Sequence, residues 1–339
     1  MNGLERLLVQ LRASRGFAHK QDIAAVVQGL DVWTGATVVP NGDDCAVLSP
    51  GPGQDYLLFA IEGLVQDFVE AMPWFAGYSA VMVNLSDVAA MGGRSLAVVN
   101  ALWASEDALA QDVLAGMRAA SQKYGVPVVG GHTNLRSSNN QLAVAVLGTA
   151  RRLISSFDAQ PGDRLVVAVD LRGRWQEPYP FWNASVTASA EQLRGDMDVL
   201  PRIAEAGWCA AGKDISMAGV LGSLLMLLEC SGVGGVVDLD CLPVPPSLVS
   251  ATLEDEAGVS AWLRWLCAFP SYGYVLSIRP EHVAPVLSAF AERGLTAADV
   301  GGVTAASSLL VQHGADQAEL WDHAQAPFIG AGRATCTAD

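Results

Sequence analysis

One stretch of this 339-residue chain, Asn-Leu-Ser-Asp-Val-Ala-Ala-Met-Gly-Gly at residues 84–93, most constrains what the chain can fold into. It ends a segment, residues 78–91, whose length and Ala, Leu and Met content predict a helix. Apolar side chains fall on every face of that helix, which indicates burial. Asn84 and Asp87, at i and i+3, share one face. Burying a lone carboxylate is very costly, so Asp87 needs a cation, an ion-pair partner or several hydrogen-bond donors. It either caps a neighbouring element or belongs to a metal or phosphate site, and we favour the site.

The composition restricts the class of protein. The chain is 51% hydrophobic and 16% charged, which is typical of a compact globular protein, and its length predicts about two domains. Its net charge of −15, without a visible basic patch, argues against nucleic-acid binding. No apolar run reaches the ~20 residues of a membrane span, and residues 1–15 lack a signal-peptide core. Six cysteines without CxxC spacing indicate neither zinc nor a disulfide framework. We therefore expect a cytoplasmic protein with no membrane partner.

The order of predicted elements indicates a mixed α+β fold. In the first half, strands at 56–61, 96–101, 126–129 and 141–149 alternate with helices at 78–91 and 106–124. A turn-rich segment around residues 151–173 marks a boundary, which predicts domains at residues 1–152 and 153–339. The second half has predicted strands at 165–169, 236–239, 272–278 and 300–304. Its predicted helices are 198–208, 220–229 and 281–293, with an irregular insert at 174–194.

Acidic residues collect at the ends of apolar elements. Asp43 and Asp44 follow a glycine, and paired carboxylates suit Mg²⁺, which prefers oxygen ligands; a plain turn explains them equally well. Glu62 ends an apolar strand, where it either presents a ligand at a sheet edge or simply leaves the sheet. Asp214 and Ser216 fall where a helix N-cap belongs, which needs no ligand.

Two further segments suit phosphate groups. Gly130 and Gly131 follow a short strand and allow backbone N–H groups to approach an anion, with Thr133 and Asn134 as polar partners. Residues 14–22, which include Lys20, form a predicted basic turn that either lies over phosphates or is a solvated loop between helices.

In this order, the motifs closely resemble the ATP-binding half of the aminoimidazole ribonucleotide (AIR) synthetase superfamily, which includes thiamine-monophosphate kinase and selenophosphate synthetase. The second half agrees: residues 161–165, 213–219 and 231–235 resemble the superfamily's C-terminal domain. The resemblance covers roughly residues 35–305, and its most specific part is the 84–93 motif.

The resemblance implies a homodimer whose N-terminal domains pair strands into a shared barrel, with ATP between the two domains of each chain. It implies Mg²⁺ ligands at Asp43, Asp44, Glu62, Asp87 and Asp214. It further implies that Asn84, Gly130, Gly131, Thr133, Asn134, Lys20 and Ser216 contact the nucleotide. Asp87, Lys213 and His132 are the expected catalytic residues, and Lys20, Lys213 or His132 would balance charge as it develops.

One departure concerns the substrate. The kinase branch carries Gly-Glu-Asp-Tyr after the second-domain helix, whereas this chain has Phe-Pro-Ser-Tyr at residues 269–272 and no acid. We expect an ATP- and Mg²⁺-dependent enzyme that phosphorylates an oxygen of a small substrate, as a kinase or as an ATP-dependent cyclo-ligase. The alternative is a nucleotide-binding regulatory or partner protein without catalysis.

Overall fold

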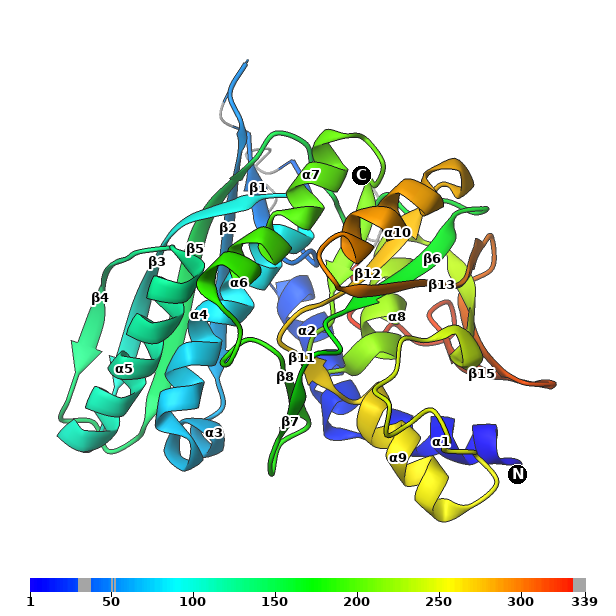
Figure 1. Ribbon diagram of the computed structural model, residues 1–339, viewed down its shortest axis with the longest axis horizontal. Coiled ribbons are helices and arrows are strands. Elements are labelled where there is room, and N and C mark those ends of the chain that lie inside the picture. Colours follow the sequence, from blue (N-terminus) through cyan, green and yellow to red (C-terminus); the bar gives the residue numbers. More distant parts are fainter. Residues whose placement is uncertain (30–37, 50, 52, 332–339) are drawn as a thin grey trace.

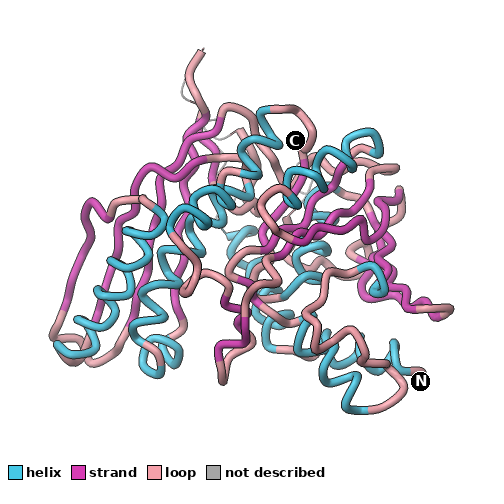
Figure 2. The backbone as a smooth tube through the Cα atoms, in the orientation of Figure 1, coloured by secondary structure: helices cyan, strands magenta, loops and turns pink. Residues whose placement is uncertain are grey.

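The computed structural model describes residues 1–29, 38–49, 51 and 53–331 of the chain. Two large β-sheets form its framework, and helices pack against both (Figure 1, Figure 2). The predicted mixed α+β architecture is confirmed. The first sheet's last strand ends at Ala150 and the second sheet's first strand begins at Arg164, so the chain passes between the sheets within the turn-rich segment.

The first sheet has the strand order β1-β2-β5-β3-β4. Its strands are β1 (Ala46–Leu48), β2 (Tyr56–Leu64), β3 (Arg94–Trp103), β4 (Val128–Asn134) and β5 (Gln141–Ala150). β3 and β4 run parallel, and the other neighbours are antiparallel. Helices α3 (Gln66–Ala71), α4 (Pro73–Ala90) and α5 (Asp107–Tyr124) lie together beside this sheet (Figure 1). The opposite face exposes apolar side chains at Phe59, Val99 and Leu147.

Helix α4 is the central element of this unit. Every residue from Phe75 to Ala90 is buried, as its apolar sequence predicts. It packs closely on α5 through two glycines: a Cβ on Gly77 would lie 2.0 Å from the Val113 carbonyl oxygen, and one on Gly116 would lie 1.9 Å from that of Trp74. Among the described residues, no helix, α4 included, has the length and hydropathy needed to cross a membrane.

The second sheet has the order β15-β14-β10-β13-β6-β12-β9. Its strands are β6 (Arg164–Val169), β9 (Ala211–Asp214), β10 (Gly234–Asp238), β12 (Gly273–Ile278), β13 (Thr296–Thr304), β14 (Ser308–His313) and β15 (Asp316–Asp322). The helices around it are α1 (Gly3–Arg12), α2 (Arg15–Gly29), α7 (Val199–Glu205), α8 (Gly219–Ser231), α9 (Glu256–Leu266) and α10 (Val283–Ala291). Helix α6 (Ala190–Met197) precedes α7 and packs against α5 of the first unit. Two 3-10 turns, η1 (Leu239–Cys241) and η2 (Pro280–His282), complete it. A small third sheet joins β7 (Arg174–Gln176), β8 (Phe181–Asn183) and β11 (Phe269–Pro270).

Hydrophobic cores lie on both faces of the second sheet. Leu165, Val167 and Val169 of β6 belong to the core that contains α8, while Val166 and Ala168 belong to the core that contains α7 and α10. The near-continuous apolar sequence of β6 follows from this two-sided burial. The leucines of α1 join the α8 core, so the N-terminal helix packs with the second sheet although it precedes the first.

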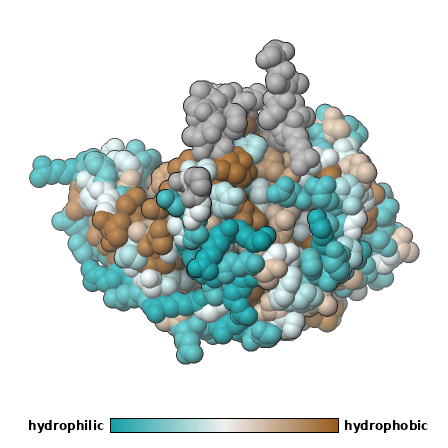
Figure 3. All heavy atoms as spheres, turned by 90° about the horizontal axis from the view of Figure 1, so that it is seen from above, coloured by the Kyte–Doolittle hydropathy of each residue, from teal (hydrophilic) through white to brown (hydrophobic). Residues whose placement is uncertain are grey.

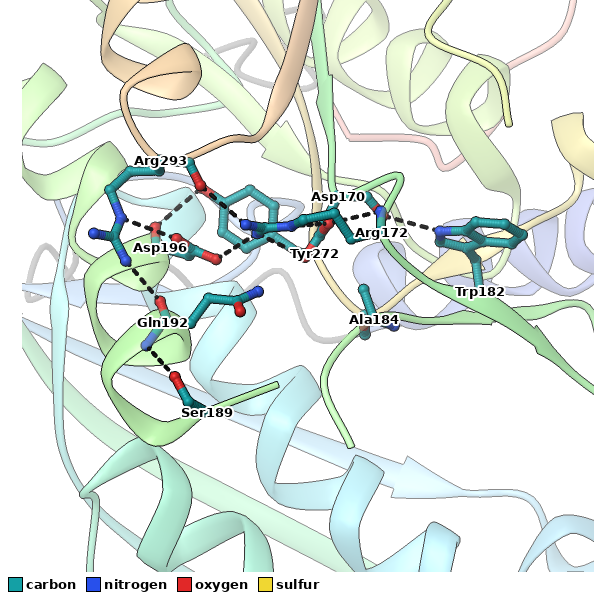
Figure 4. A network of polar contacts seen from close by, with 10 residues as sticks. Asp170, Arg172, Trp182, Ala184, Ser189, Gln192, Asp196, Tyr272 and Arg293 are labelled. Atoms are coloured by element: carbon teal, nitrogen blue, oxygen red, sulfur yellow. Dashed lines mark hydrogen bonds and ion pairs between the residues drawn. The ribbon is translucent and has the colours of Figure 1, made fainter. Parts of the chain in front are cut away.

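A buried charge network fixes α6 beside the small sheet (Figure 4). The Asp196 carboxylate, on α6, accepts hydrogen bonds from Arg172 (2.8 Å) and Arg293 (3.0 Å). Arg172 also donates to Asp170, whose backbone carbonyl accepts the indole N–H of Trp182 at 2.9 Å. The strand β8 is thereby tied to the end of β6.

Several predicted elements were wrong. The expected basic turn at residues 14–22 is helical and forms most of α2. β4 continues through Gly130 and Gly131, so these glycines lie in a strand and not in a loop. Asp214 ends strand β9, and the N-cap of α8 is Ala218. The insert at 174–194 contains β7 and β8, and two strands follow the one expected to close the fold.

The α4–α5 contact leads to a stability prediction. Gly116→Ala places a methyl group against the Trp74 carbonyl, so the helices must separate, and we expect a loss of about 1–3 kcal/mol in unfolding free energy. Urea denaturation measures this. Gly29→Ala is the control because a Cβ there meets nothing within 4 Å. Equal stability of both variants would show that the contact is not tight.

Candidate active site

A cleft of ≈ 490 Å³ lies between the two units of the fold. Side chains from both sheets line it, together with α2 and the loop before β1. Its polar lining is His19, Lys20, Asp43, Asp44, Glu62, Ser79, Asp87, Asn183, Lys213, Asp214, Ser216 and Ser271. The acidic residues that the sequence singled out at five separate positions therefore meet at one place.

Three of these acids form a compact group. Asp44, Asp87 and Asp214 each offer a carboxylate oxygen, and these oxygens lie within 4.8 Å of one another. They come from the loop before β1, from α4 and from the end of β9. A set of hard oxygen ligands converging from three elements suits a Mg²⁺ ion, which the acids could hold together with phosphate oxygens.

Lys213 supplies the buried counter-charge. Its ammonium group forms an ion pair with Asp44 Oδ1, and the backbone N–H of Asp214 donates to Asp44 Oδ2 at 3.1 Å. Burial favours the neutral amine, but the carboxylates of Asp44 and Asp43 outweigh it and raise the pKa of Lys213. The lysine is therefore a permanent cation that fixes the orientation of Asp44.

Burial and neighbouring negative charges disfavour the ionised forms of the other two acids of the trio, Asp87 and Asp214. Burial, followed by the charges of Asp214 and Glu62, raises the pKa of Asp87 well above its usual range. Burial and the neighbouring Asp44 carboxylate raise the pKa of Asp214 to about 8. The site thus has more negative charge than Lys213 offsets, and a divalent cation would relieve it.

The Asp43 carboxylate is hydrogen-bonded to the segment that connects the two units. Its carboxylate accepts hydrogen bonds from the Ser155 hydroxyl (2.8 Å), the Ser156 hydroxyl (2.7 Å) and the Ser156 backbone N–H (2.9 Å). Gly42, just before it, has φ +124°, and a Cβ there would lie 2.4 Å from the Cβ of Ala331. Asp43 therefore anchors the connecting segment, and its role as a metal ligand stays a prediction.

Glu62 and Lys20 belong to different elements that border the cleft. Glu62 is on β2 and Lys20 on α2, and both line the cavity. Glu62 is still reached by solvent, yet the surrounding protein desolvates it and raises its pKa, while the charge of Lys20 opposes that shift. Ser216 also lines the cleft, and its buried hydroxyl has no hydrogen-bond partner in the described part of the chain.

The remaining predicted residues lie elsewhere. Asn84 is buried within α4; its amide nitrogen donates to the Ala80 carbonyl at 2.7 Å, and it is not among the lining residues. The site residues expected in β4 are all exposed and do not line the cleft: the nucleotide contacts Gly130, Gly131, Thr133 and Asn134, and the catalytic candidate His132. β4 lies at the outer edge of the first sheet, far to the left of α2 in Figure 1.

Sequence reasoning missed two groups of residues, one that supports the site and one that lines the cleft. Ser155 and Ser156 hold Asp43, but serines in a turn-rich segment carry no distinctive signal. Phe68, Phe75, Phe181 and Phe269 line one part of the cleft from four different elements. Only Phe269 had a signal, since it begins the Phe-Pro-Ser-Tyr segment that stands where the kinase branch carries Gly-Glu-Asp-Tyr.

Comparison with known proteins assigns the family. The model of the AIR synthase related protein N-terminal domain matches residues 42–150, and that of the C-terminal domain matches residues 164–314. The chain belongs to this family. It is 42% identical to an uncharacterised protein of Synechocystis sp. over 96% of this chain and 98% of the relative. It is 29% identical to the thiamine-monophosphate kinase of Synechococcus elongatus, over 70% of this chain and 79% of the kinase. It is 25% identical to the selenide, water dikinase of Myxococcus xanthus, over 88% and 94%.

Solved structures agree on the fold. T. maritima PurL complexed with ADP has a TM-score of 0.67 at 19% identity, covering 88% of this chain but 46% of PurL. AaThiL complexed with AMPPCP and TMP has a TM-score of 0.61 at 20% identity, covering 83% of this chain and 91% of AaThiL. At these identities the likeness establishes the two-domain fold alone.

The raised pKa of Asp214 leads to a pH prediction. In the unfolded chain an Asp titrates near ~3.9, so a folded pKa of about 8 means that the protonated form favours the folded state. That contribution is complete below about pH 4 and is lost as the pH rises through 8. Asp214→Asn is neutral throughout, so without divalent cations its stability should decline less than wild type between pH 4 and 8.

Denaturation midpoints measured across this pH range test the prediction. Asp67→Asn, at an exposed position outside the trio, is the matched control and should follow the wild-type curve. Parallel curves for wild type and Asp214→Asn would mean that burial and the neighbouring carboxylates do not raise the pKa of Asp214 in the folded protein.

Proposed function

We propose that this protein is an ATP- and Mg²⁺-dependent phosphotransferase that transfers the phosphoryl group of ATP to an oxygen of a small substrate, as a kinase or as an activating synthetase. The observation that carries this proposal is the convergence of Asp44, Asp87 and Asp214, with Lys213, in a cleft large enough for a ligand.

Phosphoryl transfer asks mainly for positioning and charge neutralisation. Asp44, Asp87 and Asp214 would hold Mg²⁺, with Glu62 and Asp43 as further candidate ligands, and the bound ion would neutralise charge on the phosphates. Lys213 keeps Asp44 in one orientation and remains cationic. Lys20 and Ser216 line the same cavity and would contact the nucleotide, with Lys20 providing a positive charge on the α2 side. The walls of the cleft limit the access of water to the transferred group.

The relatives support this function. Two of them are named as kinases, of thiamine monophosphate and of selenide, and two neighbouring structures were determined with ADP or AMPPCP. We propose by analogy that ATP lies between domains at residues 1–152 and 153–339.

We further propose that the protein is a homodimer formed through the first sheet. Phe59, Val99 and Leu147 expose apolar surface there, and β4 is an edge strand with one paired side in the described chain. In Figure 3, hydrophobic residues gather over the half of the molecule that holds this sheet. Pairing with a second copy would cover the face and close a shared barrel. Because β4 lies away from this chain's own cleft, a phosphate contact from Gly130, Gly131 or His132 requires the cleft of a second copy.

A second candidate function is nucleotide binding without catalysis, in a regulatory or partner protein. The observation that favours it is the absence of an acid at residues 269–272, three of which line the cleft. ATP would then bind, and no candidate substrate would increase ADP release.

Asp87→Asn tests the leading proposal. The variant keeps the shape of the side chain but weakens the carboxylate trio, so the Mg²⁺-dependent rise in melting temperature with ATP should disappear. Phosphoryl transfer should fall at least ~10³-fold, as expected for a group that holds the charge-neutralising ion. Asp67→Asn serves as the control. Turnover retained by Asp87→Asn would contradict the proposal, and a missing ATP shift in wild type would exclude both candidate functions.

Charged substitutions test the dimer. Phe59 and Leu147 are directly paired across β2 and β5, so the double variant Phe59→Asp, Leu147→Asp places two like charges at the centre of the proposed interface. Sedimentation velocity should show a dimer for wild type and a monomer for this variant. Val249→Asp, at an exposed position of the second unit, should stay dimeric. A monomeric wild type at micromolar concentration would contradict the interface.

A further inference from the structure

We propose that the substrate carries a flat, uncharged aromatic ring, and that this ring binds in the phenylalanine-lined end of the cleft with a hydrogen bond to Ser79. This inference deepens the proposed function and rests on it for the position of the reacting phosphoryl group. The phenylalanine end is defined by Phe68, Phe75, Phe181 and Phe269.

The phenylalanine end is a continuous aromatic wall. The ring of Phe68, on α3, lies 5.8 Å from Phe75 of α4 and 5.0 Å from Phe181 of β8, and both contacts are edge-to-face. Phe181 lies 5.9 Å from Phe269 of β11. Two elements of the first unit and two of the small sheet thus contribute one ring each. Aromatic rings prefer such edge or offset contacts, so this wall favours a flat aromatic partner.

The phenylalanine wall and the acids lie at different points along helix α4. Phe75, Ser79, Met82, Val83 and Asp87 all line the cleft, and their spacing places them along one side of the helix. At 1.5 Å per residue, Phe75 is about 18 Å from Asp87 along the axis, and Ser79 is about 12 Å from it. A ring near Ser79 therefore leaves room for an acceptor oxygen and the transferred phosphoryl group beside the trio.

The charged lining residues belong to the other end. Glu62 and Asp214 feel the charges of Lys20, Asp44 and Lys213, so these groups form one electrostatic cluster. The described residues that line the phenylalanine end include apolar side chains and uncharged polar ones, such as Asn183 and Ser271. A charged substrate group placed there would lose water without gaining an opposite charge, which is strongly unfavourable.

Ser79 provides the polar contact. Its side chain is 6% exposed and lines the cleft one helical turn from Phe75, and its hydroxyl makes no hydrogen bond within the described chain. By contrast, Asn183 is already used: its side-chain oxygen accepts the backbone N–H groups of Ser185 and Val186. A ring nitrogen, carbonyl or hydroxyl oxygen of the substrate would accept a hydrogen bond from the Ser79 hydroxyl, which lines the cleft.

Four small probes test the inference on the full chain with AMPPCP and Mg²⁺ present. They are benzyl alcohol, benzoate, benzylammonium and cyclohexylmethanol, which separate ring flatness from charge. Ligand-observed NMR titrations should show saturable binding of benzyl alcohol. We expect the other three to bind about tenfold more weakly or worse, a difference of about 1.4 kcal/mol.

Variants locate the binding. Phe269→Ala, Phe269→Leu and Ser79→Ala should each weaken benzyl alcohol binding at least about fivefold, with the Leu variant keeping the apolar volume while losing the flat ring. Trp208→Ala, a half-buried aromatic residue outside the cleft, should change nothing. Circular dichroism confirms that each variant is folded, and Phe269 is the position of choice because it is only partly buried.

Four outcomes would overturn the inference. If benzoate or benzylammonium binds as tightly as benzyl alcohol, the phenylalanine end does not select against charge. If cyclohexylmethanol binds as tightly, the phenylalanine end does not select a flat ring. Unchanged benzyl alcohol affinity in the Phe269 and Ser79 variants would place the probe elsewhere. Competition between benzyl alcohol and AMPPCP, with both affinities lowered by Phe269→Ala, would assign this end to the nucleotide base.

Failure of the proposed function has a different signature. Asp87→Asn should lose the Mg²⁺-dependent nucleotide response yet keep benzyl alcohol binding, because Ser79 lies about two helical turns away. If wild type shows no nucleotide response but binds benzyl alcohol through Ser79 and Phe269, the phosphotransferase proposal fails and the aromatic site stands.

Discussion

The ion pair between Asp44 and Lys213 is the interaction on which the rest of this structure depends. It joins the loop before β1 to strand β9, and so connects the first sheet to the second at the point where the acids converge. Without its buried cation, Asp44 would be a third uncompensated carboxylate beside Asp87 and Asp214. Asp43, the adjacent residue, binds the segment that links the sheets. The same dipeptide therefore orders the site and fixes the two units against each other.

Much of this arrangement could be predicted from the sequence, because the relevant signals are strong and local. The buried helix with Asp87, the long helix α5 and the strands β2, β3 and β5 of the first sheet follow from periodicity and composition. The acids were predicted individually, but the sequence could not separate the roles of Asp43 and Asp44. Adjacent carboxylates look alike in sequence, and only the fold shows that one meets two serines and the other a lysine.

The errors have a common physical origin. Segment 14–22 looks like a basic turn, yet Phe17 and the neighbouring leucines of α1 bury in the core beside α8, and that burial favours a helix. Asp214 suits an N-cap, but pairing with Tyr274 extends β9 through it. The phenylalanine end could not be predicted at all, because its rings come from four elements between residues 68 and 269. Tertiary contacts decided each of these cases against the local preference.

The edge strand β4 has a consequence for how this protein behaves at high concentration. Its seven residues are exposed, and among the described strands it pairs with β3 alone. Such an edge accepts any extended chain that reaches it, including a partly folded copy of the same protein. β4 is thus a strand from which an aggregate would grow. Overproduction, which raises the concentration of partly folded chains, should therefore promote aggregation of this protein.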